Sequence, residues 1–147
     1  MDWVKEASLV FKVDKPDHFT NFEHCDECAE HDETLRNSTV DDIGLEELGN
    51  PGWDPICFSS AEGMKYYMPA FVRLCLDSVD GDFYFAQFIF HLEYGVENNK
   101  FLCACTSAQR EFVAAFLEYM INTYPYEIEE NMCTDEVLTT YQMWSKV

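Results

Sequence analysis

The clearest shortage in this 147-residue sequence is of basic side chains. Nine lysines and arginines face 28 aspartates and glutamates, which gives a formal net charge of −19 at pH 7. A surface of that sign repels the phosphates of nucleic acids and anionic membranes, and the sequence has no basic stripe with interleaved aromatic residues. We therefore expect no direct binding to nucleic acid, and we expect a macromolecular partner to be a basic protein.

Long hydrophobic runs are also absent. The most apolar stretch, residues 83–92, is too short to span a bilayer and contains Gln87 and His91. The first residues have an acid at position 2 and lack the basic and apolar regions of a secretory signal. These features predict a cytoplasmic protein that does not enter a membrane, and in that compartment the seven cysteines would be reduced thiols.

Several common catalytic motifs are missing. The sequence contains no glycine-rich phosphate loop, no GxSxG elbow and no HExxH motif. Cys57, which follows Trp53-Asp54-Pro55, is one conceivable nucleophile with His91 as its base, but a core thiol is the favoured interpretation. Cys75 and Cys103, among apolar neighbours, are expected to be core residues too. The sequence leaves open whether the protein is an enzyme.

What the sequence does contain is enough apolar material for a packed core. Hydrophobic residues make up 48% of the chain and aromatic residues 16%, a composition typical of folded proteins. The length, without repeats or an internal linker, predicts one domain over residues 1–147. The spacing of apolar residues predicts a mainly α fold, with a short strand pair near residues 83–105 as the alternative for that stretch.

Start and stop signals predict where the helices lie. A first helix is expected over residues 2–13, and a second from Thr20 or Asn21 to about Leu35. A third is expected to begin near Ser38 and to stop at Gly49. The remaining helix starts are marked by capping residues, namely Ser59 with Glu62, Thr106 with Gln109, and Thr134.

Apolar patterns within these helices predict what they bury. Pro69 is expected to kink the helix that begins near Ser59. Residues 83–94 are apolar on nearly every side, and their length favours a buried helix. The cleanest amphipathic stripe lies in residues 106–123, which should dock in the core. The inward-facing residues predicted for the last helix are Val137, Leu138, Tyr141 and Trp144.

The segment HCDECAEH, residues 24–31, is the strongest candidate for a chemical site. Two cysteines separated by two residues are the commonest half of a structural zinc site, and on a helix His24, Cys28 and His31 would share one stripe. The sequence therefore offers His24, Cys25, Cys28 and His31 as metal ligands, with zinc as the candidate ion. No second ligand pair of this kind occurs, so further ligands would have to come singly.

Two other interpretations of this segment remain open. A redox dithiol places its first cysteine at a helix N-terminus, whereas the predicted helix surrounds the pair. Neighbouring carboxylates also disfavour a thiolate. In the third interpretation the thiols simply pack inward beneath a solvated acidic face.

Short motifs along the chain carry a resemblance. They are His24-Cys25-Asp26-Glu27-Cys28, Phe58, Tyr66-Tyr67-Met68-Pro69-Ala70, and Gln109 leading into Phe116-Leu117. With these motifs the sequence resembles a family of small uncharacterised bacterial proteins, a domain of unknown function. The resemblance covers about residues 20 to 120. It implies a bacterial, cytosolic, helical domain and implies no activity.

The acidity leads to the main functional hypothesis, a non-enzymatic protein that binds a basic target. Such a protein would inhibit its target, as an immunity protein for a nuclease-type toxin does, or would mimic nucleic acid. Twelve of the 28 acids fall between positions 14 and 47. From this segment the predicted contact residues are Asp26, Glu27, Glu30, Asp32, Glu33, Asp41, Asp42, Glu46 and Glu47.

Two alternatives stand beside the basic-target hypothesis. One is a metal-binding (zinc) or thiol-dependent protein centred on Cys25 and Cys28. The other is an acidic surface that serves solubility and has no partner. The sequence does not indicate an oligomeric state.

Overall fold

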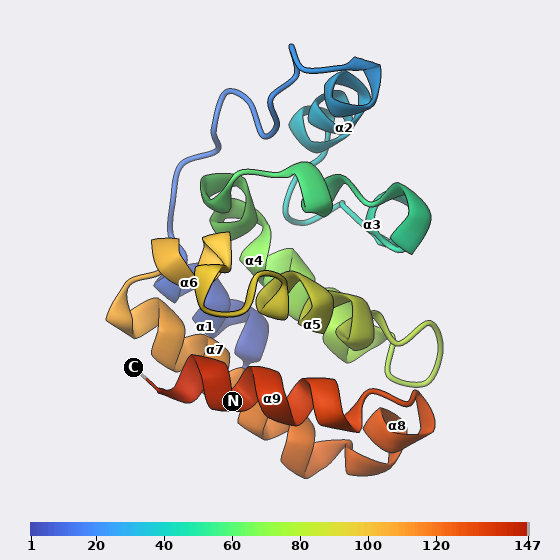
Figure 1. Ribbon diagram of the computed structural model, residues 1–147, viewed down its shortest axis with the longest axis vertical. Helices are drawn as coiled ribbons and strands as arrows, with labels where there is room; N and C mark the ends of the chain where they lie inside the picture. The colour runs from blue at the N-terminus through green and yellow to red at the C-terminus, as the bar shows by residue number, and fades with distance from the viewer. Residues whose placement is uncertain (147) are drawn as a thin grey trace.

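The computed structural model describes residues 1–146 and consists of helices joined by loops, of which the one over residues 11–25 is long (Figure 1). The α-helices are α1 (Trp3–Val10), α2 (Asp26–Asn37), α3 (Leu45–Leu48), α4 (Ala61–Asp77), α5 (Tyr84–Glu93), α6 (Lys100–Ala104), α7 (Ser107–Thr123), α8 (Pro125–Glu130) and α9 (Thr134–Ser145). Three short 3-10 helices are η1 (Pro51–Trp53), η2 (Pro55–Phe58) and η3 (Val96–Asn98). No strand occurs among residues 1–146, so the predicted mainly α fold is confirmed.

Helices α5 and α6 occupy the stretch for which a strand pair was the alternative. The helix predicted over residues 83–94 is confirmed as α5, and the strand pair near residues 83–105 is wrong. Apolar residues cover most of α5 because α4 packs on one side of it and α9 on another, while Phe90 is left 46% exposed. Trp144 of α9 fixes this contact, since its indole Nε1 donates to the carbonyl of Leu92 at 3.0 Å.

One continuous hydrophobic core lies between the helices. Helix α4 packs against α1 and α6, while α7 packs against α1 and α9. The ring of Trp3 in α1 meets those of Phe112 and Phe116, with centroids 5.8 and 5.5 Å apart. The amphipathic stripe predicted in residues 106–123 therefore docks in the core, as expected.

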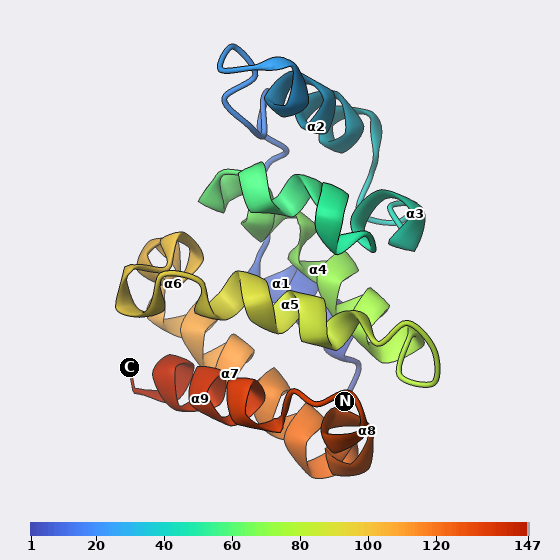
Figure 2. The same ribbon diagram turned by 45° about the vertical axis from the view of Figure 1, so that its right-hand side comes forward.

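Helices α2 and α3 lie at one end of the molecule and α7, α8 and α9 at the other (Figures 1 and 2). Side chains of α4 tie the α2 end to the rest. The Tyr67 hydroxyl donates to the carbonyl of Ser38 at 2.9 Å. The Arg73 guanidinium donates to the carbonyls of Val40 and Ile43 at 2.9 and 2.7 Å. These bonds hold the loop that follows α2.

The capping predictions have mixed outcomes. The capping box of Thr106 and Gln109 is confirmed, because each side chain bonds the other's backbone N–H at 3.2 and 2.9 Å. At the start of α4, however, the N-cap is Ser60 and not Ser59. The Ser60 hydroxyl accepts from the amide of Gly63, while the Ser59 hydroxyl donates to the carbonyl of Ser60. Thr134 is the first residue of α9, and Cys133 occupies the N-cap position.

Two helices are shorter than predicted. Helix α1 ends at Val10, and α3 covers only Leu45–Leu48. The residues after Ser38 form a turn instead, closed by the Asp42 carboxylate, which accepts from the amide of Thr39 at 2.6 Å. Helix α4 runs through Pro69 as one element.

Three burial predictions for single side chains can be checked. Cys75 is buried as predicted, but Cys103 is exposed. Leu138, predicted to face inward, is 43% exposed, because the buried residues of α9 are Val137, Thr140 and Trp144.

Phe116→Ala is expected to lower the free energy of unfolding by about 3–5 kcal/mol, because it leaves a cavity where a fully buried ring contacts Trp3 and Phe88. Urea unfolding followed by circular dichroism measures the change. Tyr126→Ala is the control, since this ring is 72% exposed and its loss should cost under about 0.5 kcal/mol. Equal effects of the two substitutions would contradict the described packing.

Candidate functional site

Helix α2 begins with a cysteine cap. Cys25 is the N-cap, and neither Thr20 nor Asn21 caps the helix as predicted. Thr20 is engaged elsewhere, because its amide donates to Asp32 and its hydroxyl donates to the carbonyl of Cys28. Asn21 accepts from the amide of His24 in a turn that precedes the helix. The thiol pair therefore stands at the first turn of α2 and not inside it.

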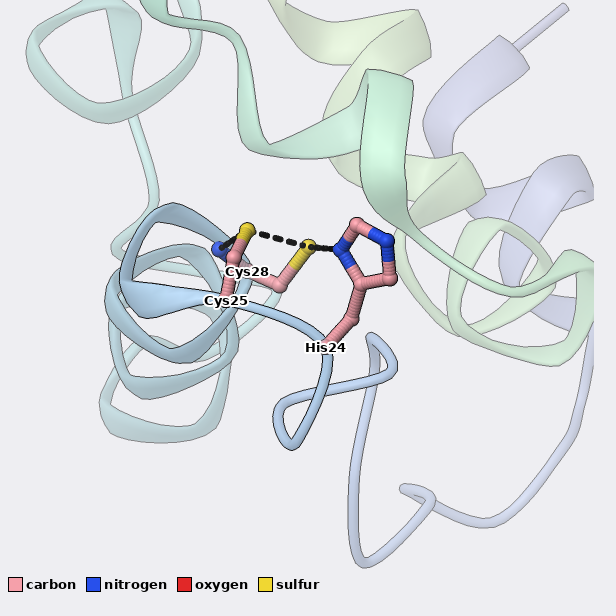
Figure 3. Close-up of side chains that lie close together, drawn as sticks. All are labelled: His24, Cys25 and Cys28. Carbon is pink, nitrogen blue, oxygen red and sulfur yellow. Dashed lines mark hydrogen bonds between the residues drawn. The ribbon is translucent and has the colours of Figure 1, made fainter.

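The two thiols and one imidazole meet at this helix start (Figure 3). The Cys25 sulfur accepts a hydrogen bond from the amide of Cys28 at 3.4 Å and lies 3.3 Å from the Cys28 sulfur. Nδ1 of His24 is 3.7 Å from the Cys28 sulfur. Each of the three residues offers a ligand atom within 4.8 Å of the other two. The structure thus brings together His24, Cys25 and Cys28 of the predicted ligand set.

The local hydrogen bonds shift the pKa values of the two thiols in opposite directions. They lower the pKa of Cys25 to about 7, through the Cys28 amide first, then the His24 imidazole and the Cys28 thiol. The pKa of Cys28 is raised, chiefly by its hydrogen bond with the Cys25 thiol, and further by burial. Cys25 is exposed, and Cys28 is buried. The pair therefore combines a reactive outer thiol with a protected inner one.

These observations correct two premises drawn from the sequence. The premise that the pair lies inside the helix is wrong, because α2 starts at Cys25. The expectation that nearby acids disfavour a thiolate is wrong for Cys25, because the Cys28 amide and the side chains of His24 and Cys28 lower its pKa. The charge of Glu27 acts on Cys28 instead, where it contributes to the raised pKa.

His31, the fourth predicted ligand, serves another purpose. It is fully buried and stacks on Phe58 with ring centroids 4.8 Å apart, and it also contacts Trp53. Its Nε2 lies 3.2 Å from Glu27, while its Nδ1 has no partner among residues 1–146. The predicted stripe of His24, Cys28 and His31 does not exist, because His24 precedes the helix. His31 packs α2 onto η1 and η2.

The acidic residues predicted to contact a partner fall into two groups. Asp32 is only 2% exposed and accepts from His18 at 2.7 Å and from the amides of Phe19 and Thr20. Burial by itself would raise its pKa, but these hydrogen bonds outweigh burial and lower it. Asp32 is thus an internal anchor and not a contact residue. The other predicted acids reach the surface, namely Asp26, Glu27, Glu30, Glu33, Asp41, Asp42, Glu46 and Glu47.

A second cluster of polar side chains joins η2 and its cap to α5. Asp54, the N-cap of η2, accepts from Nε2 of His91 at 2.7 Å and from Gln87 at 2.6 Å. Cys57, expected in the core, is exposed and joins Asp54 and His91, with ligand atoms of all three within 4.8 Å. The sequence analysis paired Cys57 with His91 but missed Asp54. The Asp54-Pro55 pair, a typical start of a helical turn, was the available signal.

Comparison with known proteins places the chain in a family. Its fold and site define a helical protein with a thiol pair at a helix start, and no helix within residues 1–146 is long and apolar enough to cross a bilayer. A family model described as a family of unknown function (DUF6714) matches residues 6–146, so the chain belongs to this family. No curated protein and no solved structure matches it significantly. The resemblance to a domain of unknown function is confirmed.

The rate of alkylation of Cys25 is expected to be half-maximal near pH 7. Iodoacetamide labelling at a series of pH values, quantified by peptide mass spectrometry, measures it. Cys57 is the control in the same molecule, because burial and the Asp54 charge raise its pKa and should delay its labelling to higher pH. Half-maximal labelling of Cys25 at about pH 8.5, the value of an ordinary thiol, would contradict the described hydrogen bonds.

Proposed function

We propose that the protein acts through the Cys25–Cys28 pair as a dithiol that exchanges with a disulfide of a partner molecule. The observation that carries this proposal is the placement of an exposed Cys25 at the start of α2, with a buried Cys28 sulfur 3.3 Å away. An accessible thiol attacks, and a neighbouring thiol resolves the product.

Three features of the site support this role. The amide of Cys28 points at the Cys25 sulfur and stabilises a thiolate there. The lowered pKa of Cys25 gives a large thiolate fraction at neutral pH, whereas the raised pKa of Cys28 keeps the second thiol protonated until it is needed. His24 lies beside both sulfurs and offers a group that can take up or return a proton.

The exchange balances in two steps. The Cys25 thiolate attacks one sulfur of the partner disulfide, that S–S bond breaks, and the other partner sulfur leaves as a thiolate that takes up a proton. Cys28 then loses its proton and attacks the Cys25 sulfur, which releases the second partner sulfur as a thiol. The partner gains two electrons and two protons, and Cys25 and Cys28 end as a disulfide.

Oxidised glutathione is a suitable probe of this exchange. The wild-type protein should form the Cys25–Cys28 disulfide and release two equivalents of reduced glutathione. Cys28→Ser should stop halfway, with one glutathione bound at Cys25, because the resolving thiol is missing. Peptide mass spectrometry after acid quenching measures both products, and Cys103→Ser is the control, since this exposed thiol lies on α6 away from the pair.

Two results of these experiments would count against disulfide exchange. Wild-type protein that accumulates glutathione on Cys25 without forming the Cys25–Cys28 disulfide would contradict the assigned role of Cys28. Zinc at one equivalent per chain that blocks both thiols until a chelator is added would favour the metal-binding alternative. His24, Cys25 and Cys28 would then be its ligands, with one coordination position left for a further group.

A second candidate function is binding of a basic protein, in the manner of an inhibitor or an immunity protein. The exposed acids of α2 and of residues 41–47 support it, because Arg36 is the only lysine or arginine between residues 23 and 47. Clustered surface charge of one sign accelerates encounter with the opposite sign. Asp26 and Glu27 lie beside the thiol pair in the first turn of α2, so a basic surface would also suit a partner in disulfide exchange.

Replacement of Glu30, Glu33 and Glu46 by lysine is expected to slow association with a basic partner more than it speeds dissociation. Glu27 is left unchanged, because its carboxylate contacts the buried His31. The matched control replaces Glu118, Glu129 and Glu130, exposed acids of α7 and α8, and changes the net charge equally.

The partner for this experiment is taken by pull-down from host lysate. Surface plasmon resonance at about 0.1 M and 1 M salt, where the Debye length is about 10 and 3 Å, measures both rates. A partner that is indifferent to salt and to both triple substitutions would contradict the charge-driven contact.

A further inference from the structure

We propose that Asp54, Cys57 and His91 form a binding site for a divalent metal ion of the zinc class, independent of the Cys25–Cys28 pair. The three residues offer a carboxylate, a thiol and an imidazole, each with a ligand atom within 4.8 Å of the others. These are the three side-chain types that bind zinc in proteins. They come from two elements, η2 with its cap and α5, so they meet only in the folded chain.

Asp54 and His91 already face one another, and their separation would have to grow from 2.7 Å to about 3.3 Å for an ion to replace the proton. Both residues are more than nine-tenths buried, and Nε2 of His91 faces the Asp54 carboxylate at 2.7 Å. Because an ionised carboxylate only accepts, this nitrogen carries the bridging proton. With the imidazole proton moved to Nδ1, the Nε2 lone pair would face an ion held between the two groups.

Small side-chain movements are enough to complete the site. Ligand atoms at about 2.0–2.3 Å from a tetrahedral zinc ion lie about 3.3–3.8 Å from one another. The exposed Cys57 has the freedom to approach, since neither a disulfide nor a hydrogen bond within residues 1–146 holds its sulfur. The Asp54 carboxylate stays oriented by the amide of Ile56 at 2.9 Å and by Gln87 at 2.6 Å.

Charge also favours a divalent ion here. An ionised Asp54 and a Cys57 thiolate supply two negative charges, and a neutral His91 supplies none. A doubly charged cation would balance the charges of Asp54 and Cys57, and holding balanced charges beside the core costs far less than holding a net charge. One proton, from the Cys57 thiol, would be released on binding.

The cluster opens onto space for a fourth ligand. Asp54 and Cys57 line a cavity of about 820 Å³, and Cys57 and His91 line a neighbouring one of about 390 Å³. Cys57 and Phe90 belong to both walls, so the cluster lies where the two cavities meet. Three protein ligands with an accessible fourth position are typical of catalytic zinc sites.

The Tyr84 hydroxyl is a second indication that the polar cluster is incomplete. It is buried and has no hydrogen-bond partner among residues 1–146. Tyr84 lies three and seven residues before Gln87 and His91 in α5, so the three side chains share one face of that helix. A buried unpaired donor is rare in folded proteins and is often explained by a bound ion or water.

Zinc titration of the full chain in a Cys25→Ser/Cys28→Ser background tests the proposal. Isothermal titration calorimetry with zinc chloride should show one ion per chain. Cys57→Ser or His91→Gln in that background should raise Kd at least about 10-fold. Cys103→Ser, at an exposed thiol of α6, should leave Kd unchanged. Titration with Co²⁺ should give a thiolate charge-transfer band that Cys57→Ser abolishes.

A second measurement avoids dependence on how the variants fold. In the Cys25→Ser/Cys28→Ser protein, zinc should protect Cys57 from alkylation and leave Cys103 reactive. Absence of stoichiometric zinc binding in this background would overturn the proposal. So would a Kd that Cys57→Ser and His91→Gln leave unchanged, together with alkylation of Cys57 that zinc does not slow. The disulfide exchange of Cys25 and Cys28 is measured separately with glutathione, so either proposal can fail while the other stands.

Discussion

A carboxylate that is 3% exposed needs hydrogen-bond donors from the fold, and Asp54 obtains three. They are the amide of Ile56 and the side chains of Gln87 and His91 in α5. Removal of one donor from a buried acceptor typically costs about 1–3 kcal/mol, and more when the acceptor is charged. The short η1 and η2 segments contain few backbone bonds of their own, so the Asp54 contacts fix them against α5.

The position of α2 depends on that segment. Trp53 and Phe58, at the ends of η1 and η2, contact the buried ring of His31, and α2 packs on η2. Aromatic contacts of this kind add about 0.5–1.5 kcal/mol beyond the apolar area they bury. The chain of contacts thus runs from Asp54 through two aromatic rings to the helix whose first turn carries Cys25 and Cys28. Both thiol-containing clusters are anchored to the same few residues.

Sequence patterns predicted the parts of this structure that local interactions decide. The Thr106–Gln109 box and the stripe of α7 needed only residues within one helix, and both are confirmed. The start of α2 was missed because Thr20 is as good a cap as Cys25 by type, but its amide and hydroxyl are used by Asp32 and Cys28. The Asp54–His91 contact joins residues 37 positions apart, and no local pattern encodes such a pairing.

At the thiol pair, a direct contact with an amide affects the Cys25 thiolate more than solvated carboxylates do. Asp26 and Glu27 reach solvent, where their charges are screened, whereas the amide of Cys28 contacts the Cys25 sulfur directly at 3.4 Å. The amide of Glu27 also helps to lower the pKa of Cys25, although its carboxylate helps to raise that of Cys28. The pKa of the outer thiol is therefore lowered first by the Cys28 amide, and then by the side chains of His24 and Cys28.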